Sequence, residues 1–181
     1  MPTYSRPSRP IEFLKAMVFI DGTNLFYRLE GNKLNLSIDL VQIFNNFIDG
    51  RQLIRTYLYT IEQHFDKAKT FHGDYIRNGV RTVYGEGVPT KNGNIKEKGV
   101  DALLVADLVY HAAVKNYDYA LLVSTDTDFV QALRRVEDFG CRTGVLSICN
   151  DIPIRLRNAC DDNQTLTKDE LINKNWVTVR D

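Results

Sequence analysis

Hydrophobic positions along the chain follow two alternating patterns. Short runs rich in aliphatic, β-branched and aromatic residues are typical of buried strands, whereas apolar residues spaced three and four apart are typical of amphipathic helices. The predicted strands cover residues 16–21, 53–61, 81–88, 119–124 and 142–148. The predicted helices cover residues 39–50, 65–78, 101–115, 129–139, 152–160 and 168–175. Strands separated by helices predict an α/β fold, with a mostly parallel sheet and helices on both of its faces.

Local signals refine the ends and faces of these elements. Gly50, Gly79 and Gly140 each follow a predicted helix, which is a usual place for the residue that ends one. The Asn92-Gly93 pair predicts a hairpin turn after the strand at 81–88. The buried face predicted for the helix at 101–115 consists of Leu104, Val105, Leu108, Val109, Ala112 and Ala113.

Size and composition bound the class of protein. The chain has 181 residues, of which 44% are hydrophobic and 25% charged, and this fits a single soluble domain. We expect residues 1–15 to be a flexible lead-in, because they are polar and contain prolines, and residues 16–181 to form the domain. No apolar stretch is long enough to cross a bilayer or to form a signal core. The cysteines at 141, 149 and 160 have no metal-type spacing and are expected to be reduced thiols, as in a cytoplasmic protein.

The charge balance gives no bulk indication of a nucleic-acid-binding protein. There are 23 basic and 23 acidic side chains, so the formal net charge is +0, whereas a strong positive charge is the usual footprint of such proteins. A local basic patch is compatible with this balance. The candidates for contact with a phosphate backbone are Lys91, Lys96 and Lys98, beside the expected hairpin, and Arg134, on the helix at 129–139.

Acidic residues stand where the predicted strands end. Asp21 is the last residue of the strand at 16–21, and Asp126 and Asp128 follow the strand that ends at Ser124. Asp101 begins a predicted helix. Ligands of parallel α/β sheets bind beyond the carboxyl ends of the strands, near the point where the strand order reverses. That edge is therefore where chemistry is expected.

Each acid has a structural explanation when it is taken alone. Asp21 can be the turn residue of an Asp-Gly pair, and Asp101 can cap the N-terminus of its helix. Asp128 can be a helix N-cap, with Gln131 three positions later completing a pair that resembles a capping box. These explanations leave Asp126 unaccounted for.

Three separate elements nevertheless deliver a carboxylate to one edge of the expected sheet. Clustered carboxylates repel one another and need a compensating charge, and oxygen ligands suit Mg²⁺ or Mn²⁺. Two such ions about 4 Å apart can stabilise both the attacking and the leaving oxygen of a phosphodiester. His64, His72 and His111 have no metal-ligand spacing, which disfavours zinc. The expected metal-binding set is Asp21, Asp101 and Asp126. Asp128 either joins this set or contacts its members without binding the ion itself.

Three motifs in a fixed order resemble a known family. They read VFIDGTNLF, IKEKGVDALLVADLV and YALLVSTDTDFVQALRRVEDFGCRTGVL, and they are similar to the NYN family, including its LabA-like (DUF88) branch. The resemblance runs from about Met17 to about Leu146. It implies a PIN-like Rossmannoid fold of three α/β/α layers, and a metal-dependent ribonuclease that acts on RNA. By motif, the site residues are Asp21 and Asn24 in the first block, Asp101 in the second, and Ser124, Asp126 and Asp128 in the third.

These residues have distinct expected roles. The aspartates would hold Mg²⁺ or Mn²⁺ directly or through water, and the metal-activated water would hydrolyse an RNA phosphodiester. Asn24 and Ser124 would orient a carboxylate or a bound water. The lysines near the expected hairpin are the preferred partners of the substrate backbone, because the sequence places them close to the acidic edge.

Two other functions compete with this interpretation. The segment from Asp126 to Val130 fits the D-x-D-x-[TV] pattern of haloacid-dehalogenase-type phosphatases, but it comes late in the chain and leaves Asp21 and Asp101 without a role. Alternatively, the domain is a non-catalytic RNA-binding or protein-binding regulatory module on the same fold. The sequence does not fix the oligomeric state, and a homo-oligomer is among the states it allows.

Overall fold

A computed structural model describes residues 10–62, 78–93 and 95–180. The helix predicted at 65–78 and most of the lead-in predicted at 1–15 lie outside the described residues. The first described element is a short 3-10 helix, η1 (Ile11–Phe13), which leads directly into the first strand.

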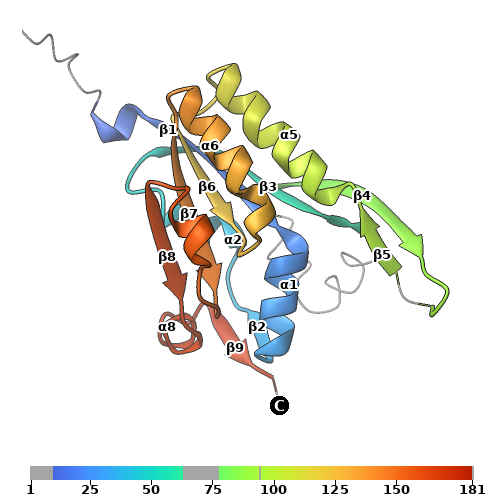
Figure 1. Ribbon diagram of the computed structural model, residues 1–181. Coiled ribbons are helices and arrows are strands. Elements are labelled where there is room, and N and C mark those ends of the chain that lie inside the picture. The colour runs from blue at the N-terminus through green and yellow to red at the C-terminus, as the bar shows by residue number, and fades with distance from the viewer. Residues whose placement is uncertain (1–9, 63–77, 94, 181) are drawn as a thin grey trace, which may run out of the picture.

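A seven-stranded sheet forms the centre of the molecule (Figure 1). Its strand order is β5-β4-β3-β1-β6-β7-β8, and all neighbouring strands are parallel except β4 and β5. The strands are β1 (Lys15–Asp21), β3 (Gln52–Ile61), β4 (Val80–Pro89), β5 (Ile95–Lys98), β6 (Tyr119–Val123), β7 (Arg142–Ile148) and β8 (Asp162–Leu166). Two further strands, β2 (Leu34–Leu36) and β9 (Val177–Val179), form a separate antiparallel pair.

Helices cover both faces of the sheet. The helices α1 (Gly22–Gly31), α2 (Leu40–Asn45) and α8 (Lys168–Asn173) contribute to one hydrophobic core. The helices α5 (Val100–Ala113), α6 (Val130–Asp138) and α7 (Ile154–Arg157) contribute to the other, and Figure 1 shows α5 and α6 side by side on that face. The prediction of a three-layer α/β/α fold with a mostly parallel sheet is confirmed.

The central strand β1 supplies both cores. Successive side chains of a strand point to opposite faces, so Ala16, Val18 and Ile20 enter one core while Met17 and Phe19 enter the other. All five are buried. This two-sided burial explains why β1 appears in the sequence as a continuous apolar run instead of an alternating one.

Several predicted element boundaries were wrong. The helix predicted at 39–50 ends at Asn45, and the helix predicted at 152–160 is a single turn at Ile154–Arg157 that buries only Leu156. The helix predicted to begin at Phe129 begins at Val130, because a 3-10 turn, η2 (Thr127–Phe129), precedes it. On α5, Ala113, the last residue of the helix, is exposed.

The expected hairpin is present. Pro89 of β4 pairs with Ile95 of β5, and the intervening turn contains Gly93, whose N–H donates to the carbonyl of Thr90 over 3.0 Å. The result is an antiparallel arm at one edge of the sheet, directly before α5.

The strand order reverses between β1 and β6. From β1 the chain builds β3, β4 and β5 on one side of the sheet, and then β6, β7 and β8 on the other. The carboxyl ends of β1 and β6 therefore flank the crevice in which open α/β sheets bind ligands. In the described part of the chain, no helix combines the length and the apolar character that a membrane span requires.

Candidate functional site

Asp21 and Ser124 meet where β1 and β6 end. Ile20 of β1 pairs with Val123 of β6, so the residues that follow them lie next to each other. The Ser124 hydroxyl donates a hydrogen bond to Oδ2 of Asp21 over 2.8 Å. Asp21 is only 6% exposed and Ser124 only 1% exposed. Ser124 therefore holds a buried carboxylate in one orientation.

Asp21 also begins α1. Its Oδ1 accepts the backbone N–H of Asn24 over 3.1 Å, which makes it the N-cap of the helix. The next residue, Gly22, lies against β3: a Cβ at this position would be 2.5 Å from the carbonyl oxygen of Tyr59. Because only glycine fits there, the Asp-Gly pair fixes the entry of the helix and, with it, the position of the carboxylate.

The environment of Asp21 opposes ionisation. Burial raises the pKa of Asp21 to about 6, although the hydrogen bonds from Asn24 and Ser124 act to lower it. Repulsion from Asp101 and Asp126 raises the pKa further. The three carboxylates thus feel one another electrostatically even though they come from three different elements.

The loop after β6 is held by its own side chains. The backbone N–H of Asp126 donates to Oγ of Ser124 over 3.0 Å, and the backbone N–H of Asp128 donates to Oδ1 of Asp126 over 2.9 Å. Asp126 is therefore the residue that caps the turn at η2, and the prediction that Asp128 is the helix N-cap was wrong. The backbone at Asp126 is extended, so its carboxylate reaches the N–H two residues ahead.

Asp101 lies in the first turn of α5 but does not cap it. The helix begins one residue earlier, at Val100, and its N-cap is Gly99, so the N-cap prediction for Asp101 was wrong. The buried Val100 side chain explains this start, because it anchors the helix to the core. Asp101 is thereby left facing the other acids of the site.

The electrostatic surroundings of Asp101 are acidic. Partial burial raises the pKa of Asp101, and repulsion from Asp126, Glu97 and Asp128 raises it further. A carboxylate whose charged neighbours are carboxylates is stabilised by a bound cation.

Glu97 is an acid of this site that the sequence analysis did not select. The Thr23 hydroxyl donates a hydrogen bond to Oε2 of Glu97, which joins β5 to the first turn of α1. Side chains alternate along a strand, so Glu97 faces the site while Lys96 and Lys98 leave β5 on the opposite side. The available signal was its place between two lysines in a hairpin arm that leads to Asp101.

Asn24 and Arg28 connect α1 to the loop after β6. Nδ2 of Asn24 donates to Oγ1 of Thr125 over 3.0 Å, and Nη2 of Arg28 reaches the same oxygen over 3.5 Å. The two residues are four positions apart and so share a helix face. The sequence analysis missed Arg28, although this spacing from Asn24 was a usable signal. Arg28 places a half-buried positive charge next to the acidic loop.

The acids of this site bear on which ion it could hold. Within the described ranges, no group of three or more acidic, histidine or cysteine side chains is arranged so that it could hold a metal ion by itself. Mg²⁺ is commonly held by one or two carboxylates and keeps several of its waters, so it does not need such a group. The acids gathered here offer oxygen donors only. This set fits Mg²⁺ or Mn²⁺ better than zinc.

The other basic candidates lie on the hairpin and on α6. Lys91, Lys96 and Lys98 are exposed on the hairpin, and Arg134 is exposed on α6, where it acts on the pKa of Glu137. Among the described residues, none of these four side chains forms a hydrogen bond or an ion pair with an acid of the site, so the structure does not bring them into the acidic cluster. These four residues are part of the exposed surface of the hairpin and α6.

Replacing Asp21 by Asn is expected to stabilise the metal-free protein at high pH. The pKa of Asp21 is about 6 in the folded chain against an ordinary value of 3.8, so the wild type loses stability as the pH rises through this interval. An amide avoids that loss, and the free energy of unfolding at pH 8 should rise by up to about 3 kcal/mol. Urea unfolding in a chelating buffer at pH 8 and at pH 3.5 measures the effect.

The gain should disappear at pH 3.5, where the wild-type carboxyl is protonated in both the folded and the unfolded chain. The matched control is Asp138→Asn, which removes an exposed acid paired with Arg135 at the end of α6 and should change stability by under about 1 kcal/mol. Equal unfolding free energies for Asp21→Asn and wild type at pH 8 would contradict the argument.

Known proteins resemble this chain in sequence and in fold. Residues 15–167 match the NYN domain. The chain is 29% identical over 163 residues to the low amplitude and bright protein LabA of Synechococcus elongatus, which covers 86% of this chain and 82% of that protein. The crystal structure of a protein of unknown function from Vibrio parahaemolyticus superposes with a TM-score of 0.70 at 16% identity, over 94% of this chain and 99% of that one. At that identity, the second similarity bears on the fold alone.

Proposed function

This chain belongs to the NYN domain family, and from that premise we propose that it is a divalent-metal-dependent ribonuclease. Family membership points to a nuclease-type, RNA-related function, and the proposed reaction is hydrolysis of an RNA phosphodiester. The observation that carries the proposal is the meeting of Asp21, Asp101 and Asp126, whose charges act on one another at the point where the strand order reverses. Structural capping explains the contacts of single acids, but it does not explain their convergence.

The chain's own residues would prepare the site in two ways. Asp21, Asp101 and Asp126 would hold Mg²⁺ or Mn²⁺ directly or through water, with Asp128 and Glu97 adding negative charge beside them. When bound, the ion would supply an activated water and neutralise charge on the phosphate. Ser124 would keep Asp21 from rotating away, because its hydroxyl bonds one carboxylate oxygen while the start of α1 bonds the other.

Arg28 would be the nearest positive partner of the substrate. Its guanidinium stands at Thr125, the residue between Ser124 and Asp126. A planar guanidinium can bind a phosphate through two N–H groups, which is the geometry that a backbone phosphate beside the acids would require. The exposed hairpin residues Lys91, Lys96 and Lys98, together with Arg134 on α6, would contact the RNA strand further from the cleaved bond.

The proposal is tested by cleavage of labelled single-stranded and structured RNA. The purified chain is expected to cleave RNA in millimolar Mn²⁺ or Mg²⁺ and to stop when the metal is chelated. Millimolar Mn²⁺ should also raise the melting temperature, because an ion that binds only the folded chain stabilises it. A folded chain that binds RNA but cleaves none of the substrates, and gains no stability from Mn²⁺, would favour the non-catalytic binding module instead.

A further inference from the structure

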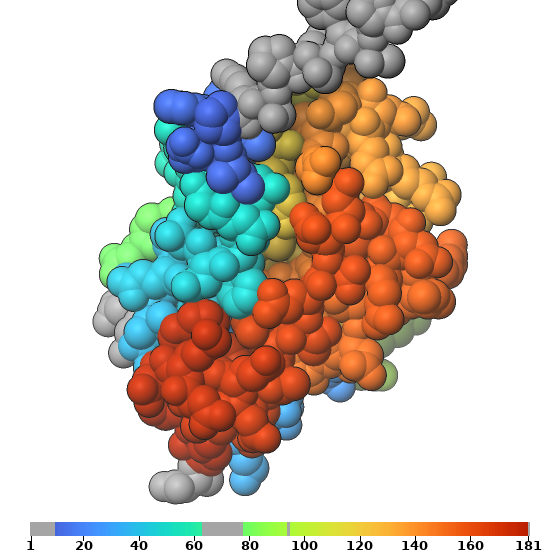
Figure 2. All heavy atoms as spheres, turned by 90° about the vertical axis from the view of Figure 1, so that its left-hand side faces the viewer, coloured from blue at the N-terminus to red at the C-terminus, as the bar shows by residue number. Residues whose placement is uncertain are grey.

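A second site lies at the opposite end of β6 from the acidic cluster. Ser124 follows the last residue of β6, whereas Tyr119 is its first residue and lines a pocket of about 200 Å³. The pocket opens between the segment after α2 and the edge strand β8, and Figure 2 shows these two parts facing each other across a hollow. None of the residues assigned to the acidic site lines it.

Tyr119 presents its hydroxyl to this pocket. The residue is 2% exposed, and across the described residues no hydrogen-bond partner meets its hydroxyl. A Cβ on Gly144 would lie 1.9 Å from that oxygen, so the ring rests on a glycine of β7 that leaves it room. Burial raises the pKa of Tyr119 and keeps it a neutral phenol. Because the hydroxyl lines the pocket without a protein partner among the described residues, a ligand in the pocket can supply one.

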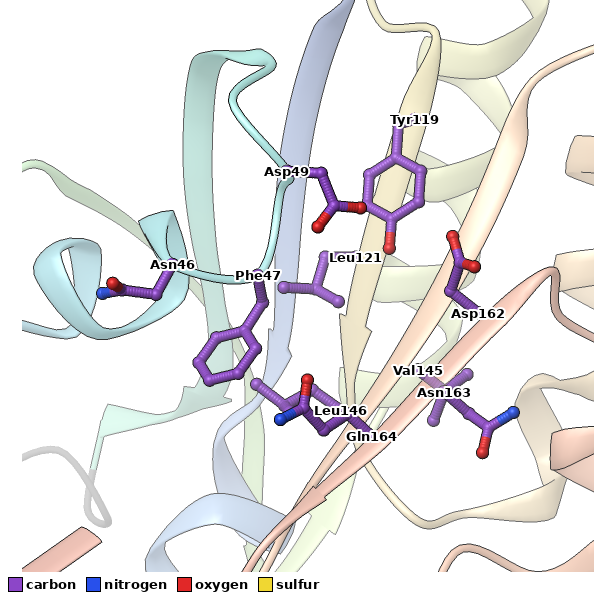
Figure 3. Close-up of a pocket in the computed structure, with 10 residues that line it drawn as sticks. All are labelled: Asn46, Phe47, Asp49, Tyr119, Leu121, Val145, Leu146, Asp162, Asn163 and Gln164. Atoms are coloured by element: carbon purple, nitrogen blue, oxygen red, sulfur yellow. The ribbon is translucent and has the colours of Figure 1, made fainter. Parts of the chain in front are cut away.

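The charges around Tyr119 favour a cation. Asp49 and Asp162 both line the pocket, and Figure 3 shows Tyr119 between them. Arg51 lies outside the lining, with Cζ 4.1 Å from the centre of the Tyr119 ring and Nη1 bonded to Oδ2 of Asp49 over 3.1 Å. Arg51 thus compensates Asp49. Among the described residues, no ion pair compensates Asp162, so the pocket keeps one negative charge.

Part of the lining suits an alkyl chain, and the remainder includes the polar side chains of Asn46, Asn163 and Gln164. Leu121 and Leu146 lie below the Tyr119 hydroxyl, and Phe47 stands at the side (Figure 3). Apolar walls of this kind accept the methylene stem of a long cationic side chain. A small anion would meet two carboxylates here and would be repelled.

We propose that this pocket binds the end of an alkyl guanidinium or alkyl ammonium group. Such a group carries donors only, which matches the acceptors offered by Asp162, Asp49 and the Tyr119 hydroxyl. The same chemistry occurs in an arginine or lysine side chain of a protein partner and in a free amine. Binding at this pocket leaves the proposed catalytic acids untouched, because the two sites stand at opposite ends of β6.

The test is a titration followed by backbone amide NMR of the full chain. The probes are agmatine as the free amine, N-acetyl-arginine methylamide as a peptide-like side chain, and N-acetyl-citrulline methylamide as the uncharged match. We expect saturable shifts at Tyr119, Leu121 and Asp162 with the two cations, and no such shifts with the citrulline compound. Tighter binding of the arginine amide than of agmatine would support a protein partner as the source, and the reverse order would support a small amine.

Single-residue variants distinguish binding at this pocket from general attraction of the cations by surface charge. Asp162→Asn and Tyr119→Phe should each weaken the binding of the cations by about tenfold, because the first removes the negative charge that faces the cation and the second removes an acceptor from a charged donor. Asp169→Asn, which makes the same charge change on exposed α8, should leave binding unchanged. Equal shifts from the citrulline compound, or unchanged binding of the cations in Asp162→Asn, would overturn the proposal.

Discussion

Replacing Asp126 by Asn is expected to reduce RNA cleavage by more than about 100-fold while the chain stays folded. Oδ1 of Asp126 accepts the N–H of Asp128, and an asparagine retains that oxygen, so the turn at η2 should persist. The negative charge that Asp126 directs toward Asp21 and Asp101 is lost, however, and with it much of the affinity for a divalent ion. Initial cleavage rates at saturating Mn²⁺ measure the effect, and the melting temperature with and without Mn²⁺ reports metal binding separately.

Asp138→Asn is the matched control for this change. It replaces another acid, one that is exposed and paired with Arg135 on α6, so cleavage and the Mn²⁺-dependent rise in melting temperature should stay at the parent level. Parent-level cleavage in Asp126→Asn would show that Asp126 is a capping residue alone. Lost cleavage with an unchanged Mn²⁺ effect would mean that Asp126 acts on the substrate instead of on the ion.

The layer architecture was predictable because burial leaves a strong mark on sequence. The strands β1, β6 and β7 are buried on both faces, so each appears as an almost unbroken apolar run. The helices α5 and α6 alternate with these runs, and the handedness of the crossovers then allows few arrangements. The buried strands and the helices between them could therefore be predicted from the spacing of apolar residues.

The elements that the sequence analysis missed lie at edges. The strands β5 and β8 read IKEK and DNQTL, and most of their side chains are exposed, so no apolar pattern distinguishes them from loops. Both are strands because a neighbouring strand, β4 or β7, offers backbone hydrogen bonds. The short pair of β2 and β9 joins segments from opposite ends of the chain, and no local signal predicts such a contact.

The candidate site, too, was predictable in part: one contact followed from a general rule for parallel sheets, and another did not. Parallel strands end at the same edge of a sheet, and this rule predicted that Asp21 would lie beside the residues after β6. The contact of Thr23 with Glu97 depends on how the β4–β5 hairpin folds back over α1, and the sequence does not encode that distance in any short motif. The caps were misassigned for a smaller reason, a shift of one or two residues at Asp128 and Asp101.

Gly22→Ala is expected to destabilise the chain by about 2–3 kcal/mol, because the added methyl group overpacks a tight contact. The new Cβ would lie 2.5 Å from the backbone oxygen of Tyr59 and 3.0 Å from Cβ of Thr60. A carbonyl inside a sheet cannot move aside as a flexible side chain can, so α1 must shift instead. Because Asp21 precedes this residue directly, its carboxylate should move away from Ser124. Urea unfolding measures the lost stability, and both the Mn²⁺-dependent rise in melting temperature and RNA cleavage should fall with it.

Gly31→Ala is the matched control within the same helix. Gly31 is the last residue of α1, and a Cβ there would meet no atom within 4 Å. Alanine is a better helix former than glycine, so this variant should be neutral or more stable by up to about 1 kcal/mol, with parent-level metal binding. If Gly22→Ala were equally stable and still responded to Mn²⁺, the close approach of α1 to β3 would not be what positions Asp21. If Gly22→Ala were less stable but kept its metal response at low temperature, Gly22 would serve the fold alone. The site would then tolerate a shift of α1, the helix that Asp21 caps.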